Sequence, residues 1–377
     1  MKVILLTHEY PPFRGGIATY CYETAKAAGE QSLPLEVWVP WRSKRARRRV
    51  IPLSNERMIF CGRRLSLLNL CLMVLALFLK RKQLRGASLI AGSVAAHRAV
   101  MLLMAMGGLR GCKLFSLLHS SEILKFHRSA FWRRLAKRFF KRAEAVFVAS
   151  EFTRKLLESH FWARHIILAP CAASSAAAQE VGELKPREKE EFRVLTLARI
   201  HPRKGQLETA RSLALLPEQL RAKVVYVVGG KGSFGYLWKV KVFCRQHGVR
   251  CKTLGAVADK NLARVYASCD LFMMTSRSLA DSVEGFGMSY LEAAYHGKPA
   301  VAFRTGGVGE AVLHGKTGWL VNEGDLEGAA AAVRRLMEDA AMRQSFGQRA
   351  REHGRSFDWK KTARMIVQTV FDGHPYG

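Results

Sequence analysis

The segment "EGFGMSYLEAAYHGKPAVAFRTGGVGEAVLHGKTGWLV" (residues 284–321) places two glutamates, Glu284 and Glu292, eight positions apart. Gly285 and Gly287 allow tight backbone geometry after the first glutamate, and the residues that follow predict a helix closed by a glycine and a proline. The free amides at the start of that helix form a site for anions. Both carboxylates are expected to project toward one cleft, where they would accept hydrogen bonds from the vicinal hydroxyls of sugars and riboses.

The composition limits the class of protein. A chain of 377 residues, about half of them apolar, favours two domains with sizeable cores. The net charge is +31, and residues 1–172 hold 30 Lys and Arg against 9 Glu and no Asp, a net charge of +21. This excess predicts an anionic partner surface, either nucleic acid or an acidic membrane.

Two further sequence features bear on compartment and on metals. The apolar run that opens the chain, Val3 to Leu6, is too short for an export signal, so we expect a buried first strand and a cytoplasmic protein. The eight cysteines form no Cys-x-x-Cys pair, which indicates neither a zinc site nor a disulfide framework.

Short apolar runs alternate with helical stretches in both halves, which predicts two doubly wound parallel sheets of the α/β class. Ligands of such sheets bind beyond the carboxyl ends of the strands. We expect an N-terminal Rossmann-like domain over residues 1–172, a linker over 173–190 and a second domain over 191–357, with a C-terminal helix (358–377) packing back on the first domain. The expected strands are 3–7, 35–39, 88–91, 113–118, 145–149 and 166–168 in the first half, and 193–198, 223–228, 251–254, 271–275, 300–303 and 318–320 in the second.

Two stretches of the first half could face a membrane. The run of mostly apolar residues 65–79, followed by Lys80, Arg81 and Lys82, is shorter than the roughly 20 residues of a spanning helix. It favours a buried core helix over a membrane-dipping helix with a basic collar. The stretch "FWRRLAKRFFKRA" (131–143) separates aromatic and cationic faces, which favours a helix at an anionic interface over a core helix with a solvated basic face.

The cationic face of that second stretch includes four basic side chains that we expect to meet a membrane or an anionic acceptor. The loop "RSKRARRR" (42–49) adds further positive charge suited to anionic headgroups. The four expected membrane or acceptor contacts are Arg133, Arg134, Lys137 and Arg138.

The chain resembles the retaining GT-B glycosyltransferases of the Glu-x7-Glu family (glycosyl transferases group 1), which includes bacterial mannosyl-, glucosyl- and heptosyltransferases. The resemblance covers nearly the whole sequence: "PPFRGGIATY", "VFVASEFTRKLL", "LARIHPRKG" and the opening segment with its "TGG" and "HGKTGWLV". It implies two Rossmann-like domains facing across a cleft. It also implies that Glu284 binds hydroxyls of the transferred sugar and that Glu292 binds the donor ribose.

The motif "LARIHPRKG" ends a predicted strand and is followed by Arg199 and Lys204. Two cations at the carboxyl end of a strand suit a diphosphate, although each read alone could be a surface cation. The resemblance assigns them to the donor diphosphate and the leaving group, and Arg203 is set aside as a neighbour outside the motif.

Glycine turns and one histidine complete the expected site. Gly15 and Gly16 would present backbone amides to the donor phosphate, and Gly229 would let the nucleotide approach the chain. The resemblance implies that His119 supports catalysis near the transferred sugar and that Glu122 orients it. The remaining expected donor contacts are Val257, Gly285, Phe286, Gly287 and Met288; Gly306 and Gly307 line the donor cleft.

The sequence contains no Asp-x-Asp motif, so we expect cations and helix amides to hold the diphosphate without a cofactor or essential metal. The predicted function is a retaining glycosyltransferase that uses a nucleotide sugar and a glycan or lipid-linked acceptor. Its setting would be lipopolysaccharide or surface-polysaccharide synthesis at the inner face of the cytoplasmic membrane. The alternatives are a sugar-nucleotide epimerase of the same fold and a nucleic-acid binder; charge alone suggests the latter, so no nucleic-acid partner is expected.

Overall fold

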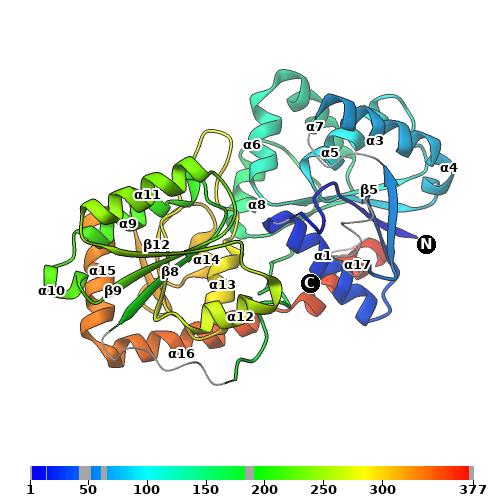
Figure 1. The fold of residues 1–377 in the computed structure, drawn as a ribbon. Helices are drawn as coiled ribbons and strands as arrows, with labels where there is room; N and C mark the ends of the chain where they lie inside the picture. The colour runs from blue at the N-terminus through cyan, green and yellow to red at the C-terminus, as the bar shows by residue number, and fades with distance from the viewer. Residues whose placement is uncertain (1, 14, 42–51, 61–65, 183–190, 373–377) are drawn as a thin grey trace. The chain divides into compact units, whose positions relative to one another are not determined.

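The computed structural model describes residues 2–13, 15–41, 52–60, 66–182 and 191–372 (Figure 1). The chain forms two compact units: residues 1–171 with 358–377, and residues 172–357. The cationic loop 42–49 and residues 183–190 of the expected linker lie outside the described residues. Residues 173–182 were also expected to be linker, but they belong to the second unit, where Ser174 donates a hydrogen bond to Glu292.

The first unit is built on a seven-stranded sheet in the order β3-β2-β1-β4-β5-β6-β7, with parallel pairing throughout. Its central strands are buried along their whole length, as expected for a parallel sheet covered on both faces. The strands are β1 (Val3–Leu6), β2 (Leu35–Pro40), β3 (Glu56–Phe60), β4 (Ser88–Ala91), β5 (Lys113–Leu118), β6 (Ala145–Val148) and β7 (Ile166–Leu168).

Strand β3 was missing from the sequence prediction. It pairs with β2 at the edge of the sheet, and only its last residue, Phe60, is buried. An edge strand with little buried surface needs no long apolar run, and "ERMIF" has only three apolar residues in succession. The helices of this unit are α1 (Gly16–Glu30), α3 (Leu67–Leu79), α4 (Arg81–Leu84), α5 (Val94–Ala105), α6 (Ser121–Arg128), α7 (Ala130–Arg142), α8 (Glu151–Glu158) and α17 (Trp359–Asp372).

Helices α3, α5 and α7 lie over one face of this sheet, and α1 and α17 over the other (Figure 1). Helix α17 packs on α1, and Trp359 contacts the ring of Tyr20 edge-on at a centroid distance of 5.0 Å. Thr362 of α17 also donates a hydrogen bond to the carbonyl of Pro170. Helix α17 is therefore part of the first unit's core.

Helices α3 and α7 differ from the sequence prediction in which side chains they bury. In α7, the large apolar residues Leu135, Phe139 and Phe140 lie in the core, whereas Phe131 at the start of the helix is 57% exposed, so only part of the aromatic face is buried. In α3, Leu70, Met73 and Leu77 are the only buried residues, and the opposite side exposes large apolar side chains. The expectation of a core helix for α3 is thus right for one face only. None of the helices in the described part of the chain is long and apolar enough to span a membrane.

The second unit repeats the architecture with a six-stranded parallel sheet in the order β10-β9-β8-β11-β12-β13. Its strands are β8 (Phe192–Leu197), β9 (Val224–Gly229), β10 (Arg250–Gly255), β11 (Leu271–Met274), β12 (Ala300–Phe303) and β13 (Gly318–Val321). Its helices are α9 (Gln206–Ala214), α10 (Glu218–Arg221), α11 (Phe234–Gln246), α12 (Asp259–Ala267), α13 (Met288–Tyr295), α14 (Val308–Ala311), α15 (Leu326–Glu338) and α16 (Ala340–Ser356), with the 3-10 turn η1 (Pro202–Lys204).

Both sheets reverse their strand order at one point, between β1 and β4 in the first unit and between β8 and β11 in the second. The loops that leave the carboxyl ends of the two central strands diverge at such a point and leave a crevice for ligands. In the second unit these are the loop from β8 to α9 and the segment from β11 to α13. They contain Lys204 and Glu284 respectively.

Candidate functional site

The β8–α9 loop reaches the end of β11 through Gly205. This glycine has a φ of +70°, and a Cβ built on it would lie 1.8 Å from the carbonyl oxygen of Thr275. The Thr275 hydroxyl in turn donates a hydrogen bond of 2.8 Å to the Gly205 carbonyl. Only glycine permits this approach, and it places the preceding residue, Lys204, beside the segment that follows β11.

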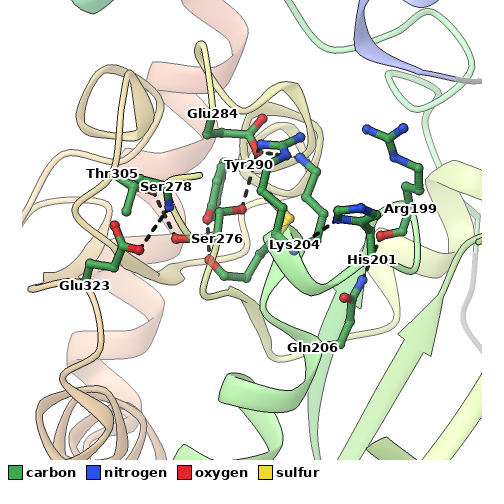
Figure 2. A network of polar contacts seen from close by, with 12 residues as sticks. Arg199, His201, Lys204, Gln206, Ser276, Ser278, Glu284, Tyr290, Thr305 and Glu323 are labelled. Carbon is green, nitrogen blue, oxygen red and sulfur yellow. Dashed lines mark hydrogen bonds and ion pairs between the residues drawn. The ribbon is translucent and has the colours of Figure 1, made fainter. Parts of the chain in front are cut away.

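Glu284 forms the centre of a buried ionic cluster in the second unit (Figure 2). Its Oε2 lies 2.5 Å from Nζ of Lys204 and 3.1 Å from Nη1 of Arg203. The hydroxyl of Ser276 donates a third hydrogen bond, of 3.3 Å, to the same oxygen. Arg203, which was set aside as a neighbour outside the motif, is therefore part of the cluster. The loop sequence did not indicate this, because the turn of η1 decides which side chains point inward.

Charge pairing outweighs burial at Glu284. Burial by itself would raise the pKa of the carboxyl, but the Lys204 ammonium and the Arg203 guanidinium lower it to about 2. The pKa of Lys204 is lowered, first by burial and despite the attraction of Glu284. The cluster therefore places two basic side chains, Lys204 and Arg203, around one carboxylate.

The "TGG" turn clamps the backbone of Glu284. Gly307 donates a backbone hydrogen bond of 2.9 Å to the Glu284 carbonyl. Gly306 has a φ of +53°, and a Cβ built on it would lie 2.0 Å from that same carbonyl oxygen. The Thr305 hydroxyl donates a hydrogen bond of 3.2 Å to the carbonyl of Ser276. The glycines were expected to line the donor cleft, which stays a prediction; in the structure they position the backbone of Glu284.

The clamp gives the first prediction. Gly306→Ala combines a left-handed backbone with a steric clash at the Glu284 carbonyl, so we expect a loss of at least about 3 kcal/mol in the free energy of unfolding. The matched control is Gly315→Ala, since Gly315 has a φ of +70° but open space around it. Backbone strain alone should cost the control about 1–2 kcal/mol in a urea titration. Equal losses in the two variants would contradict the clamp.

Glu292 belongs to a separate network. It lies in the second turn of α13 and is buried. The hydroxyl of Ser174 donates to Oε1 at 2.5 Å, and the phenol of Tyr266 donates to Oε2 at 2.6 Å. Burial raises the pKa of the Glu292 carboxyl, although hydrogen bonds from the Ser174 hydroxyl, the Tyr266 phenol and the Ser174 backbone amide act in the opposite direction. Ser174 and Tyr266 lie far away in the sequence and were not among the predicted site residues.

Arg199 differs from Lys204 in its surroundings. Its side chain is exposed, and its guanidinium makes no ion pair with any residue that the structure describes. Its backbone carbonyl accepts a hydrogen bond of 2.9 Å from the side-chain amide of Gln206 (Figure 2). The loop therefore presents one cation, Arg199, that remains available for an anionic ligand.

The glycines at the end of β9 serve packing within the unit. A Cβ on Gly229 would lie 2.5 Å from Cδ1 of Leu197 and 3.4 Å from Cγ2 of Val257. A Cβ on Gly230 would lie 1.8 Å from the Ala198 carbonyl oxygen. Gly229 and Val257, two expected donor contacts, are thus neighbours. The close approach of β8 and β9 is by itself a sufficient reason for these glycines.

The turn before α13 contains the remaining expected donor contacts. Gly287 caps the helix with a φ of +94°, and Met288 begins it. Gly285 is half-buried, whereas Phe286 is buried and packs edge-on against Phe357 at a centroid distance of 5.4 Å. The side chain of Phe286 therefore anchors the turn in its own unit.

In the first unit, Gly15 and Gly16 are exposed at the start of α1. A Cβ on either glycine would meet no atom within 4 Å, and the first turn of the helix contains no acidic residue. This open start of a helix could receive an anion, and the expected contact with a donor phosphate stays a prediction.

His119 follows β5 and contacts the ring of Tyr20 edge-on at a centroid distance of 4.8 Å. Burial lowers the pKa of the imidazole to about 4, so His119 is neutral at pH 7. Its Nε2 is buried, and no described residue forms a hydrogen bond with it. Glu122 was expected to orient the ring, but its Oε2 accepts a hydrogen bond of 3.1 Å from the backbone amide of His119. It therefore holds the turn and not the imidazole.

A second histidine, His8, lies at the strand reversal of the first sheet and was not predicted. Its Nδ1 lies 2.8 Å from the hydroxyl of Ser93, which follows β4. Burial, with a smaller effect from Lys125, lowers the pKa of His8 to about 4. This contact joins the loops after β1 and β4, and a strand-end histidine after "LLT" was the only signal for it in the sequence.

Two family models match the chain, one in each half. The model described as "Glycosyltransferase Family 4" matches residues 14–173, and the model described as "Glycosyl transferases group 1" matches residues 181–353.

A full-length relative among curated proteins is the GDP-mannose-dependent alpha-(1-6)-phosphatidylinositol monomannoside mannosyltransferase of Mycobacterium tuberculosis. It is 27% identical over 93% of each chain. Alignments to further curated relatives are shorter, covering 22% to 47% of those proteins.

Solved structures share the fold. Sucrose-phosphate synthase from Thermosynechococcus elongatus superposes with a TM-score of 0.80 at 19% identity, over 99% of each chain. The HepE protein of Anabaena in complex with UDP-glucose gives a TM-score of 0.77 at 21% identity, over 99% of this chain and 100% of the other.

Proposed function

Because this chain belongs to the glycosyltransferases of the GT-B fold, we propose that it transfers a hexose or heptose from a nucleotide sugar to a glycan or lipid-linked acceptor, with retention of anomeric configuration. The observation that carries the proposal is the cationic cluster of Lys204 and Arg203 around Glu284, at the strand reversal of the second sheet. A similar structure holds UDP-glucose, which supports a nucleotide sugar as the donor.

The positive charge of the second unit suits a diphosphate leaving group. The bond between the anomeric carbon and the diphosphate oxygen breaks, and a bond to the acceptor oxygen forms. In the proposed front-side reaction the acceptor's proton passes to the departing diphosphate oxygen. Lys204 and the exposed Arg199 stabilise the negative charge that develops there, without any metal being required.

Glu284 is proposed to bind a hydroxyl of the transferred sugar. Its Oε2 accepts all three of the hydrogen bonds described above, whereas Oε1 accepts none from the described residues. The carboxylate remains ionised because its pKa is about 2. Oε1 is therefore the acceptor available to a sugar hydroxyl.

Glu292 is proposed to bind the donor ribose. Ser174 and Tyr266 each occupy one lone-pair direction of its carboxylate, and each oxygen can accept a second hydrogen bond. The two protein donors hold the carboxylate in one orientation, so a diol would meet a preorganised acceptor. In the first unit we propose that His119, as a neutral imidazole, forms a hydrogen bond with the transferred sugar.

A thermal-shift screen with a panel of nucleotide sugars tests the donor. We expect one of them to raise the melting temperature of the wild type, and Glu292→Gln to weaken its affinity by about 10-fold, the loss of a charge-assisted hydrogen bond. His119→Ala should mainly lower turnover, measured as release of nucleoside diphosphate. Glu338→Gln, on the exposed side of α15, is the control.

Two outcomes of this screen would count against the assignments. If no nucleotide sugar stabilises the wild type, the proposed donor class is wrong. If Glu292→Gln binds the donor as tightly as the wild type, the ribose assignment is wrong while the donor class stands.

The acceptor is proposed to be anionic and lipid-linked, at the inner face of a bacterial cytoplasmic membrane, in lipopolysaccharide or surface-polysaccharide synthesis. A similar mannosyltransferase is named for a phosphatidylinositol mannoside, and the first half of this chain carries a net charge of +21. The exposed cations Arg134, Lys137 and Arg138 of α7, with the half-buried Arg133, would meet the acceptor or the anionic headgroups around it.

A further inference from the structure

Helix α3 exposes a contiguous apolar face that no described residue covers. Leu67, Leu68, Leu75 and Leu79 are 78%, 68%, 52% and 69% exposed. Together with Cys71 and Phe78 they occupy one side of the helix, opposite the buried Leu70, Met73 and Leu77. Scattered single leucines are ordinary on a protein surface, whereas a stripe of them along one helix marks an interaction site.

The sequence on both sides of this apolar face is strongly cationic. Residues 57–143 contain 18 Lys and Arg and one acidic residue, Glu122, which is buried. Arg81, Lys82 and Arg85 are exposed directly after α3, and the Arg81 guanidinium lies over the ring of Phe78 at 4.2 Å. No acidic side chain is exposed within this stretch to neutralise them.

Helices α3 and α7 belong to the same layer of helices, and each exposes its outer side. Both pack against α5, over the same face of the first sheet (Figure 1). Arg98 of α5 lies over the ring of Trp132 of α7 at 4.8 Å. The apolar face of α3 and the cationic face of α7 therefore belong to the same side of the first unit.

We infer that α3 inserts its leucine face into an anionic lipid surface, and that the cations after α3 and on α7 bind the headgroups. The helix has 13 residues and a length of about 20 Å, so it would lie in the plane of the interface and not cross the bilayer. The inference deepens the proposed function and rests on it for one point, that the acceptor is lipid-linked.

Charge favours lipid over the other occupants of such a face. A second copy of the chain would bring two cationic collars together, which disfavours self-association. An anionic bilayer complements both parts of the surface, because acyl chains cover the leucines while phosphates pair with the lysines and arginines.

The test is sedimentation with vesicles of phosphatidylcholine containing 30% phosphatidylglycerol, compared with pure phosphatidylcholine. We expect the full-length protein to bind the anionic vesicles, and Leu68→Glu/Leu75→Glu to lose at least about 10-fold in affinity. Both positions are already exposed, so the substitutions remove no core packing. Leu215→Glu is the matched control, since Leu215 is 50% exposed on the second unit.

Three outcomes would overturn the insertion of α3. The first is unchanged vesicle binding by the Leu68→Glu/Leu75→Glu variant. The second is binding that only reversal of Arg133, Arg134, Lys137 and Arg138 abolishes, which would indicate surface electrostatics alone. The third is vesicle-independent dimerisation that Leu75→Glu removes, seen by sedimentation velocity.

Donor binding separates this inference from the proposed function. The Leu68→Glu/Leu75→Glu variant should retain the thermal shift with the nucleotide sugar, since α3 lies in the other unit from Glu284 and Glu292. If the wild type inserts into vesicles but transfers sugar only to soluble acceptors, the lipid-linked acceptor is wrong and the membrane helix stands. If the wild type transfers sugar to a lipid acceptor and the Leu68→Glu/Leu75→Glu variant still binds vesicles, the lipid-linked acceptor stands and the insertion of α3 is wrong.

Discussion

Replacing Lys204 with methionine is expected to lower the rate of sugar transfer by about 100-fold to 1,000-fold, the range typical for removing one preorganised group that stabilises developing charge. The Lys204 ammonium is buried beside Glu284, and burial lowers its pKa. A poorly solvated cation loses little hydration when it meets a diphosphate, so its effect on the leaving group is large. The measurement is release of nucleoside diphosphate at saturating donor.

Two controls make the Lys204 result specific. Lys241→Met removes an exposed lysine from α11 and should leave the rate unchanged. Lys204→Arg retains the charge but not the compact ammonium, so partial activity is expected. A Lys204→Met enzyme with the wild-type rate would refute the role of Lys204 in stabilising the leaving group.

Glu284→Gln is expected to have the largest effect on stability. The variant leaves Lys204 and Arg203 buried without a carboxylate, and breaking a buried ion pair from one side costs about 3–5 kcal/mol. Urea unfolding at pH 7 measures this loss. Glu338→Gln removes an exposed glutamate from α15 and should change the free energy of unfolding by less than about 1 kcal/mol.

The pH dependence of the Glu284 contribution has a definite sign. The pKa of this carboxyl is about 2 in the folded protein, against an ordinary value of 4.5. A depressed pKa stabilises the fold above the unfolded value, so the contribution is complete above about pH 4.5 and is lost as the pH falls toward 2. The stability difference between wild type and Glu284→Gln should shrink over this window. A difference that stays constant would contradict the ionised cluster.

The sequence was informative where a pattern is local. Runs of apolar residues predicted the buried strands of both sheets, because each central strand is covered on both faces and has to be apolar throughout. The edge strand β3 was not predicted, because it buries little surface. Glu284, Lys204 and the glycines around them were predicted from short motifs, and the structure brings Glu284 and Lys204 into direct contact.

The helices show the limit of local patterns most clearly. The stretch 131–143 has an aromatic and a cationic side, and most of the aromatic side is core while Phe131 is exposed. The more uniformly apolar α3 was expected to be buried, and half of it is exposed. A sequence records which side chains are apolar. Which of them become buried depends on how many helices can pack on that face of the sheet.

The sequence by itself determined the type of fold and the chemistry of the candidate site: two parallel α/β units, with carboxylates, cations and glycines at the ends of strands. Only the tertiary structure decided the partners of each group. Arg203 joins Lys204 at Glu284, and Ser174 and Tyr266 hold Glu292. These contacts span 81, 118 and 26 positions of the chain. Arg203 and Glu284 meet because the loops after β8 and β11 lie side by side at the reversal of strand order, and that reversal is a property of the folded sheet.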